Sequence, residues 1–316
     1  MTILDPITQS SKIYIAGHRG MVGSAIWRLL EDSGYKNLIG WSSSELNLTD
    51  RDKTVRKILD ASPEVVIMAA ARVGGIGSNN KFPVEFLTEN TRIQNNVFEA
   101  SQLAQVSRLL FLGSSCIYPK FADQPIQASS LLTGPLEPTN DAYAIAKIAG
   151  VLHVQAYRRE YGLKWISVMP TNLYGPFDNF DLETSHVLPA LIRKFHDAKM
   201  LGHSEVSLWG DGSALREFLH VDDLARACLH LLMEYDEVDP INVGYGEDVS
   251  INELAQLIAK VTGYSGNIHW DTSKPNGTPK KLLDSTPMLK LGWKPKMSLE
   301  RGIRETYEWY VANNQR

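Results

Sequence analysis

Short apolar runs alternate with stretches of helical length over the first two thirds of the chain. Apolar runs that are rich in β-branched residues and bounded by glycine are typical of parallel strands buried on both faces. We predict strands at Lys12–Ala16, Leu38–Gly40, Val65–Ala69, Leu109–Leu112 and Trp165–Met169. The alternation favours strand–helix–strand units, and therefore an α/β fold with a doubly wound parallel sheet.

Helices are predicted at Met21–Leu30, Ala142–Tyr161 and Val221–Met233, and from Ser250 to about Val261. Asp222 and Asp223 are expected to cap the third of these, because carboxylates are favourable near the positive end of a helix. Ser250 and Glu253 have the spacing of a capping box, in which each side chain accepts the backbone N–H of the other residue. Both signals mark helix starts in the second half of the chain.

A glycine-rich loop, Gly17–Gly23 (GHRGMVG), follows the first predicted strand and opens the first predicted helix. Glycine permits a tight turn and close approach of the backbone to a pyrophosphate, while the helix N-terminus supplies N–H donors. A plain strand-to-helix turn is the alternative, but the position favours a Rossmann-type dinucleotide site. Its residues would be Gly17, His18, Arg19, Gly20, Met21, Val22 and Gly23.

The end of the second strand bears on the choice of cofactor. An Asp or Glu there would bind the adenosine ribose of NAD. This chain has Trp41–Ser44 instead, with no carboxylate before Glu45. Arg19 can pair with a 2′-phosphate through its guanidinium, unless it is an ordinary surface arginine. The pattern therefore favours NADP(H).

Composition narrows the class of protein. The 316 residues are 43% hydrophobic and 22% charged, with a net charge of −4 and no basic block, so we expect neither a nucleic-acid nor a membrane partner. Cys116 and Cys228 are too few for a disulfide framework and lack metal-ligand spacing, so no metal is expected. Cys228 lies in an apolar helical stretch and is expected in the core. Met1–Ser11 lacks the features of a secretory signal, which favours a cytoplasmic protein.

Tyr143 and Lys147 lie one helical turn apart on one face of the predicted helix Ala142–Tyr161. The lysine ammonium is expected to lower the pKa of the phenol, so that Tyr143 exchanges a proton with a substrate oxygen near neutral pH. Lys147 can also reach a nicotinamide ribose. Ser114 or Ser115, at the end of the fourth strand, is expected to hold that substrate oxygen beside Tyr143. These signals together predict dehydrogenase chemistry at a carbonyl carbon.

These residues resemble the extended short-chain dehydrogenase/reductase superfamily over nearly the whole chain. Within it, seven segments are similar to the GDP-L-fucose synthase family: GHRGMVG at 17–23, ARVGGI at 71–76, GSSCIYPK at 113–120, PTNLYGP at 170–176, SHVLPA at 185–190, REFLHVDD at 216–223 and KPNGTPKKLLD at 274–284. The resemblance implies an NADP-dependent oxidoreductase with isomerase activity. Its members epimerise C3 and C5 of GDP-4-keto-6-deoxy-D-mannose and reduce C4 with NADPH, which yields GDP-L-fucose.

The resemblance also implies which residues invert C3 and C5. Both carbons flank the C4 ketone, so enolate formation acidifies their protons, and Tyr143 with Ser114 would stabilise the oxyanion. Inversion needs a base on one face and an acid on the other, and by resemblance these are Cys116 and His186. A thiolate is a credible base where a nearby cation or helix end stabilises its charge. From the residues alone, a buried structural cysteine and a structural histidine remain the alternatives.

Further ligand contacts follow from the resemblance. To the cofactor it assigns Leu112, Gly113, Ser114, Ser115, Lys147, Pro170, Thr171, Asn172, Leu173 and His186, with Asn172 and Leu173 against the nicotinamide. To the GDP moiety it assigns Lys194, Trp209, Arg216, Asn276 and Lys281, with core packing as the alternative for Trp209. Two positions depart from the family. Trp41 stands where many members have an arginine for the 2′-phosphate, and Asn276 stands where they often have Asp.

We expect a dinucleotide-binding Rossmann domain over residues 1–173 and a smaller C-terminal substrate-binding lobe over 174–316, with elements at about 221–245 returning to the first domain. A homodimer is expected by resemblance, through the helix that carries Tyr143 and the one before it. Another nucleotide-sugar epimerase, reductase or dehydratase of this fold is an alternative, although a dehydratase normally has carboxylates where Ser114–Cys116 stand. A non-catalytic dinucleotide sensor is a second alternative, but such proteins commonly lose the Tyr or Lys that this chain keeps.

Overall fold

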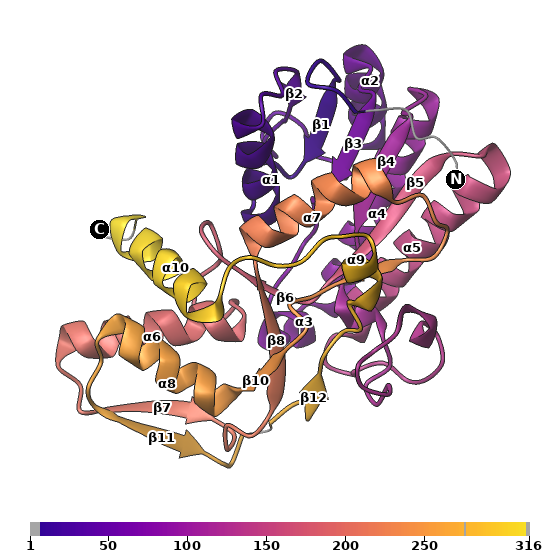
Figure 1. Cartoon of the computed structure of the whole chain (residues 1–316). Coiled ribbons are helices and arrows are strands. Elements are labelled where there is room, and N and C mark those ends of the chain that lie inside the picture. Colours follow the sequence, from indigo (N-terminus) through magenta and orange to yellow (C-terminus); the bar gives the residue numbers. More distant parts are fainter. Residues whose placement is uncertain (1–6, 275, 314–316) are drawn as a thin grey trace.

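The computed structural model describes residues 7–274 and 276–313, and a parallel sheet of six strands lies at the centre of that part of the chain (Figure 1). The strands are β1 (Ile13–Ala16), β2 (Leu38–Ile39), β3 (Val65–Met68), β4 (Arg108–Leu112), β5 (Lys164–Pro170) and β9 (Ile241–Val243). They lie in the order β2-β1-β3-β4-β5-β9, and every neighbouring pair is parallel. The predicted α/β fold with a doubly wound sheet is confirmed, because the winding reverses between β1 and β3.

The five predicted strands are all present, and their ends differ from the prediction by no more than one residue. The inner strands β3 and β4 are buried at every residue. A strand that is covered on both faces must be apolar throughout, which explains why continuous apolar runs locate these strands so well. Arg108 is the exception in β4, and its guanidinium donates to the carbonyl oxygens of Leu232 and Tyr235.

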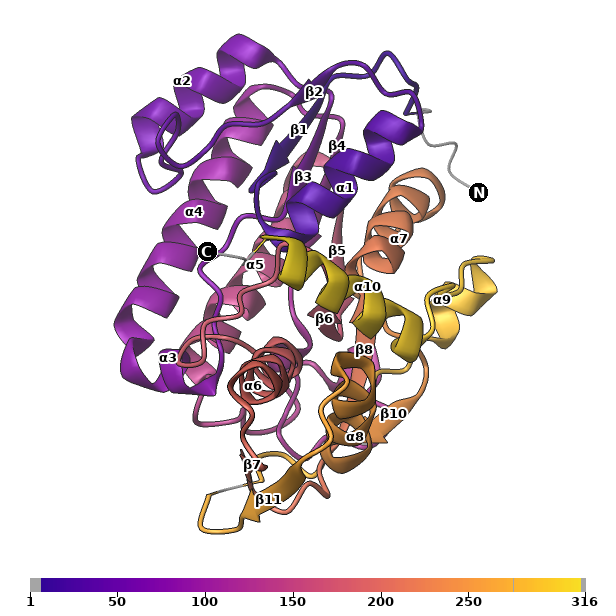
Figure 2. The same cartoon turned by 90° about the vertical axis from the view of Figure 1, so that its left-hand side faces the viewer.

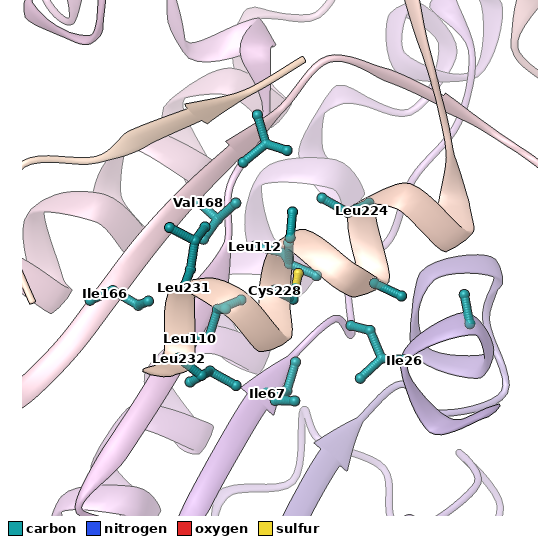
Figure 3. Close-up of a cluster of buried hydrophobic side chains, with 14 of the residues drawn as sticks. Ile26, Ile67, Leu110, Leu112, Ile166, Val168, Leu224, Cys228, Leu231 and Leu232 are labelled. Carbon is teal, nitrogen blue, oxygen red and sulfur yellow. The ribbon is translucent and has the colours of Figure 1, made fainter. Parts of the chain in front are cut away.

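Helices cover both faces of this sheet (Figure 2). α1 (Met21–Asp32) and α7 (Val221–Glu234) pack on one face, whereas α2 (Arg51–Ala61), α4 (Pro83–Leu103) and α5 (Asp141–Tyr161) pack on the other. Two shorter helices, α3 (Ile76–Lys81) and α9 (Thr286–Lys290), lie in the connections. Cys228 on α7 is buried among Ile67, Leu110 and other apolar side chains of the first face (Figure 3), so the prediction that it belongs to the core is confirmed.

A second layer of structure forms the lobe that Figure 1 shows below the sheet. Its helices are α6 (Val187–Leu201), α8 (Ile251–Thr262) and α10 (Leu299–Asn313), and its strands are β6 (Asn172–Tyr174), β7 (Glu205–Trp209), β8 (Leu215–His220), β10 (Asp248–Ser250), β11 (Asn267–Asp271) and β12 (Lys280–Lys281). These elements share an apolar core of their own, built around Phe195, Leu254 and Ile303. β6 follows the main-sheet strand β5 after one residue and pairs in parallel with β8, so the chain passes directly from the main sheet into this lobe.

The start of α7 differs from the prediction. His220 is the N-cap residue, and its Nδ1 accepts the backbone N–H of Asp222. The predicted position of Asp222 and Asp223 near the positive end of the helix is confirmed, since both lie in its first turn, but neither is the N-cap residue. Asp222 binds Arg28, while Asp223 accepts the backbone N–H groups of two residues that precede α10. By contrast, the predicted capping box at the start of α8 is confirmed.

Membrane-spanning helices and metal-binding clusters are both absent from the described residues. No helix among them is both long enough and apolar enough to cross a bilayer. No three of their His, Cys, Asp or Glu side chains lie together in a way that could hold a metal ion.

Candidate active site

The candidate site lies at the carboxyl edge of the main sheet. Parallel strands bring their carboxyl ends to one edge, and ligands bind there near the point where the winding reverses. The glycine loop follows β1, Ser114 follows β4, and Asn172 follows β5. Residues that are far apart in the sequence therefore meet along this edge.

The glycine loop has the geometry that a dinucleotide diphosphate requires. Gly17 has a φ of +84°, and a Cβ there would lie 2.8 Å from the backbone nitrogen of Ala70. A Cβ on Gly23 would overlap the carbonyl oxygen of Gly17, so α1 begins in direct contact with the loop. Gly20 is the N-cap of α1 without a side-chain cap, and the first turn holds no acidic residue. Its N–H groups thus remain available to phosphate oxygens, and the loop fits the diphosphate of NADP(H).

The segment after β2 holds one carboxylate and two nearby cations. The backbone N–H and hydroxyl of Ser42 donate to Glu45 at 2.8 and 2.6 Å, and these bonds lower the pKa of Glu45. Arg19 and Lys57 both act electrostatically on that carboxylate. Lys57 also reaches over Trp41, with its Nζ 5.4 Å from the ring centre. Lys57 is therefore a second candidate for a 2′-phosphate contact, which the sequence analysis did not single out.

Ser114, Tyr143 and Cys116 meet at the end of β4. The Ser114 hydroxyl is hydrogen-bonded to the phenol of Tyr143 and accepts the backbone N–H of Cys116 at 3.2 Å. Ser115 is instead only 3% exposed. Of the two serines considered from the sequence, the structure brings only Ser114 to Tyr143.

The ammonium of Lys147 donates to the carbonyl oxygen of Leu112 at 2.8 Å and lies 5.9 Å from the centre of the Tyr143 ring. Burial lowers the pKa of Lys147 to about 8. The pKa of Tyr143 is raised, first by burial and then by the charge of Cys116, while the bond to Ser114 opposes this. The predicted lowering of the phenol pKa by Lys147 is therefore wrong for this structure, because desolvation outweighs every other effect. A phenol with a raised pKa stays protonated near neutral pH, which suits a proton donor.

Replacing Lys147 by Met is expected to raise the free energy of unfolding at pH 7 by about 1 kcal/mol, although activity is lost. The pKa of Lys147 is about 8 in the folded protein against an ordinary value of 10.5, so folding below pH 8 buries an unfavourable charge. Between pH 8 and 10.5 the unfolded chain keeps the proton that the folded protein releases, so wild-type stability rises with pH. The advantage of Lys147→Met should therefore shrink across that range.

Urea unfolding at pH 7 and pH 10 measures this difference directly. Lys36→Met, at an exposed position, is the matched control and should change stability little at either pH. A Lys147→Met variant that is less stable than wild type at pH 7, or whose advantage grows at pH 10, would contradict the expected buried charge.

Cys116 is partly exposed and forms no disulfide. Asn140 Nδ2 lies 3.4 Å from its Sγ, and Lys281 Nζ lies 3.5 Å from the same atom. The alternative of a buried, purely apolar cysteine does not fit these two polar contacts. Lys281, which resemblance assigned to the GDP moiety, is thus in contact with the predicted base.

His186 is the N-cap residue of α6, and its imidazole is surrounded by protein atoms although the residue as a whole keeps an exposed surface. Desolvation by the surrounding protein, and then the charge of Lys281, lower its pKa. Because Lys281 acts on both His186 and Cys116, these three residues share one neighbourhood. The structure therefore brings the predicted acid and the predicted base to the same place, from the lobe and from the main sheet.

Arg216 and Lys281 are register partners on β8 and β12, so their side chains lie on one face of the small sheet. Burial lowers the pKa of Arg216, and the charge of Glu137 opposes this. Two cations are thus held on one face, and one of them, Lys281, contacts Cys116.

The other three residues assigned to GDP lie further out in the lobe. Trp209, at the end of β7, is 67% exposed, so the core-packing alternative is wrong. Lys194 Nζ donates to the carbonyl oxygen of Ser207 at 3.2 Å, and burial lowers its pKa. Asn276 accepts the backbone N–H of Asp211 at 2.9 Å. Lys274 Nζ lies 5.9 Å from the centre of the Trp209 ring, so the exposed indole already has one cation over it.

A model of the NAD dependent epimerase/dehydratase family matches residues 13–244, which span the glycine loop, Ser114, Tyr143 and Lys147. The chain belongs to this family. GDP-L-fucose synthase 1 of Arabidopsis thaliana is 54% identical over 305 residues, which cover 96% of this chain and 94% of that protein. The predicted family resemblance is thereby confirmed.

Solved structures of family relatives share the whole fold. The GDP-6-OMe-4-keto-L-xylo-heptose reductase from C. jejuni has a TM-score of 0.93 and 34% sequence identity. The matched region covers 98% of this chain and 100% of the chain of that reductase. A GDP-L-fucose synthetase from Naegleria fowleri bound to NADP has a TM-score of 0.90 and 31% sequence identity. The matched region covers 98% of this chain and 96% of the chain of that synthetase.

Two polar residues of this family member support the site although the sequence analysis gave them no role. Asn140 lies three residues before Tyr143 and contacts Cys116. Glu217 is buried in β8 and accepts the backbone N–H groups of Gly246 at 2.7 Å and Leu283 at 3.1 Å. A glutamate within an apolar strand indicates from the sequence that a buried carboxylate has a structural role. The indication is weak, because the sequence does not say which N–H groups the carboxylate accepts.

Proposed function

We propose that this protein epimerises C3 and C5 of GDP-4-keto-6-deoxy-D-mannose and reduces C4 with NADPH, which yields GDP-L-fucose. The observation that carries the proposal is the meeting of a Ser114–Tyr143 pair with Cys116 and His186 at one edge of the sheet. Reduction alone would require only the first pair. A base and an acid beside it fit a reaction that also inverts the neighbouring carbons, and the fucosyl product fits the name GDP-L-fucose synthase of the relative that is 54% identical.

Epimerisation uses the acidity of carbons that flank a ketone. Cys116 takes the proton from C3 or C5, and the electron pair of that C–H bond moves into the C4 carbonyl to form an enolate. Ser114 and Tyr143 donate hydrogen bonds to the enolate oxygen, which is where the negative charge develops. His186 returns a proton to the other face of the carbon, and the ketone forms again with inverted configuration.

Reduction of C4 uses the same two hydrogen-bond donors. NADPH, when bound, supplies the hydride to C4. Tyr143 gives its phenolic proton to the carbonyl oxygen, and its raised pKa keeps that proton in place until it is needed. Lys147, held by Leu112, provides a positive charge near the phenolate that remains.

Nucleotide binding is assigned to the lobe in this proposal. Arg216 and Lys281 lie on one face of the small sheet, where two cations suit a diphosphate. Trp209 is 67% exposed and offers a flat surface to guanine, with Lys194 and Asn276 nearby on the same lobe. The division into a dinucleotide-binding domain over residues 1–173 and a substrate-binding lobe over 174–316 belongs to the same proposal.

The test is to incubate the purified protein with GDP-4-keto-6-deoxy-D-mannose and NADPH in deuterated water. Cofactor absorbance reports the reduction, and deuterium in the product reports the epimerisations. The expected result is cofactor oxidation with deuterium at C3 and C5 of a fucosyl product. Oxidation without deuterium would reduce the function to that of a 4-reductase. No reaction with either NADPH or NADH would rule out this substrate.

A homodimer in the cytoplasm completes the proposal. Exposed apolar side chains on the adjacent helices α4 and α5 support a subunit interface there, namely Val84, Leu87, Ile145 and Leu152. Cys116 must remain a free thiol for the proposed role, which suits a reducing compartment. Light scattering after gel filtration should give twice the mass of the chain.

A further inference from the structure

Cys116 receives two hydrogen-bond donors from different parts of the fold. Asn140 Nδ2 comes from the start of α5, and Lys281 Nζ comes from β12 of the small sheet. A sulfur anion is stabilised strongly by a cation and by an N–H donor, whereas a neutral thiol is only a weak acceptor. Both contacts therefore place donor hydrogens, one of them on a cation, at the sulfur of Cys116.

Asn140 contacts Cys116 and not the helix that it begins. An Asn at the N-cap ordinarily accepts a backbone N–H of the first helical turn with its side-chain oxygen. In α5 this bond does not form, and the buried Oδ1 of Asn140 has no hydrogen-bond partner in the described part of the chain. The side chain is oriented so that its amide nitrogen points to the sulfur.

Lys281 is held in place by the strand that carries it. Gln124 accepts the backbone N–H of Leu282 at 2.8 Å, and Glu217 accepts that of Leu283 at 3.1 Å. Lys280, the preceding residue of β12, points to the opposite face and pairs with Asp248 at 3.1 Å. The backbone thus selects which of two adjacent lysines faces Cys116.

We propose that Lys281 and Asn140 are positioning residues that hold Cys116 as a thiolate, ready to remove the protons from C3 and C5. This inference rests on the proposed function and deepens it. The thiolate takes one proton and becomes a thiol, while His186 gives one proton and becomes neutral. Exchange of both groups with solvent then restores the starting charges, so that each inversion leaves the protein unchanged.

The titratable groups that face Cys116 are Tyr143 from α5 and Lys281 from β12, and the charge of Lys281 also acts on His186. Of these, Lys281 is the group whose ammonium lies at hydrogen-bond distance from the sulfur, 3.5 Å away. Lys281 is accordingly the group whose removal should change the reactivity of the sulfur most.

The test measures alkylation of Cys116 by iodoacetamide in the full-length protein without substrate, by mass spectrometry between pH 5.5 and 9.5. Lys281→Met is expected to lower the alkylation rate at pH 7 by about tenfold and to move the profile to higher pH. Lys281→Arg keeps the charge and should stay within about threefold of wild type. Lys280→Met is the matched control on the same strand and should match wild type, while buried Cys228 serves as the unreactive internal standard.

Asn140→Asp tests the second donor. Asp is an equally good N-cap residue, so the melting temperature should not fall, but its carboxylate repels a thiolate. Alkylation at pH 7 should slow by about threefold to tenfold. If Lys281→Met and Asn140→Asp alkylate like wild type, the inference is overturned, even if turnover falls, because Lys281 then serves only the substrate. Since no substrate is present, this result is independent of whether the proposed reaction is right.

Discussion

Replacing Tyr143 by Phe is expected to lower the rate of NADPH oxidation by about a thousandfold, within the range typical for loss of a general acid. Phe keeps the ring and its packing, but it removes the phenolic proton and the hydrogen bond to Ser114. Hydride transfer to C4 then leaves an alkoxide without a proton donor, in a site where burial already disfavours charge. Stopped-flow absorbance of the cofactor under single-turnover conditions measures the effect.

Tyr161→Phe is the matched control on the same helix, since Tyr161 is 52% exposed at the far end of α5. Its rate should equal that of wild type. In Tyr143→Phe, deuterium from solvent should still enter the recovered substrate, because Cys116 and His186 are intact. Unchanged cofactor oxidation in Tyr143→Phe would show that another group protonates the C4 oxygen.

Cys116→Ser is expected to lower deuterium entry at C3 and C5 by about a thousandfold, while NADPH oxidation continues on the unepimerised ketone. Serine fills nearly the same volume and can still contact Asn140 and Lys281. Its hydroxyl, however, is far less acidic than a thiol, so it does not become an anionic base near neutral pH. The two activities should therefore separate in this single variant.

Mass spectrometry and NMR of the product give the deuterium content at each carbon. Cys228→Ala, which removes the other thiol from the core, should retain deuterium at both carbons in whatever fraction stays folded. His186→Asn should give an enzyme that removes a proton but returns it without inversion. Full deuteration and inversion by Cys116→Ser would assign the base to another residue.

The sequence determined the parts of this protein that depend on local pattern. Continuous apolar runs located the five strands, because a strand that is buried on both faces needs apolar side chains at nearly every position. The order of glycine loop, serine and Tyr143–Lys147 pair along the chain predicted one shared site, because parallel strands place their carboxyl ends at one edge. Ser250 and Glu253 predicted the capping box of α8 because the two partners lie within one helical turn, so their contact depends only on local spacing.

Only the tertiary structure decided matters that depend on burial and on contacts between distant segments. It brought Lys281 to Cys116 across 165 residues of sequence, and chose Ser114 over Ser115 beside Tyr143. It also reversed the expected direction of the Tyr143 pKa, since desolvation depends on every atom around the phenol and not on the lysine one turn away. Spacing along the chain specifies which groups can meet on one helix, but their charge state follows from what the whole fold packs around them.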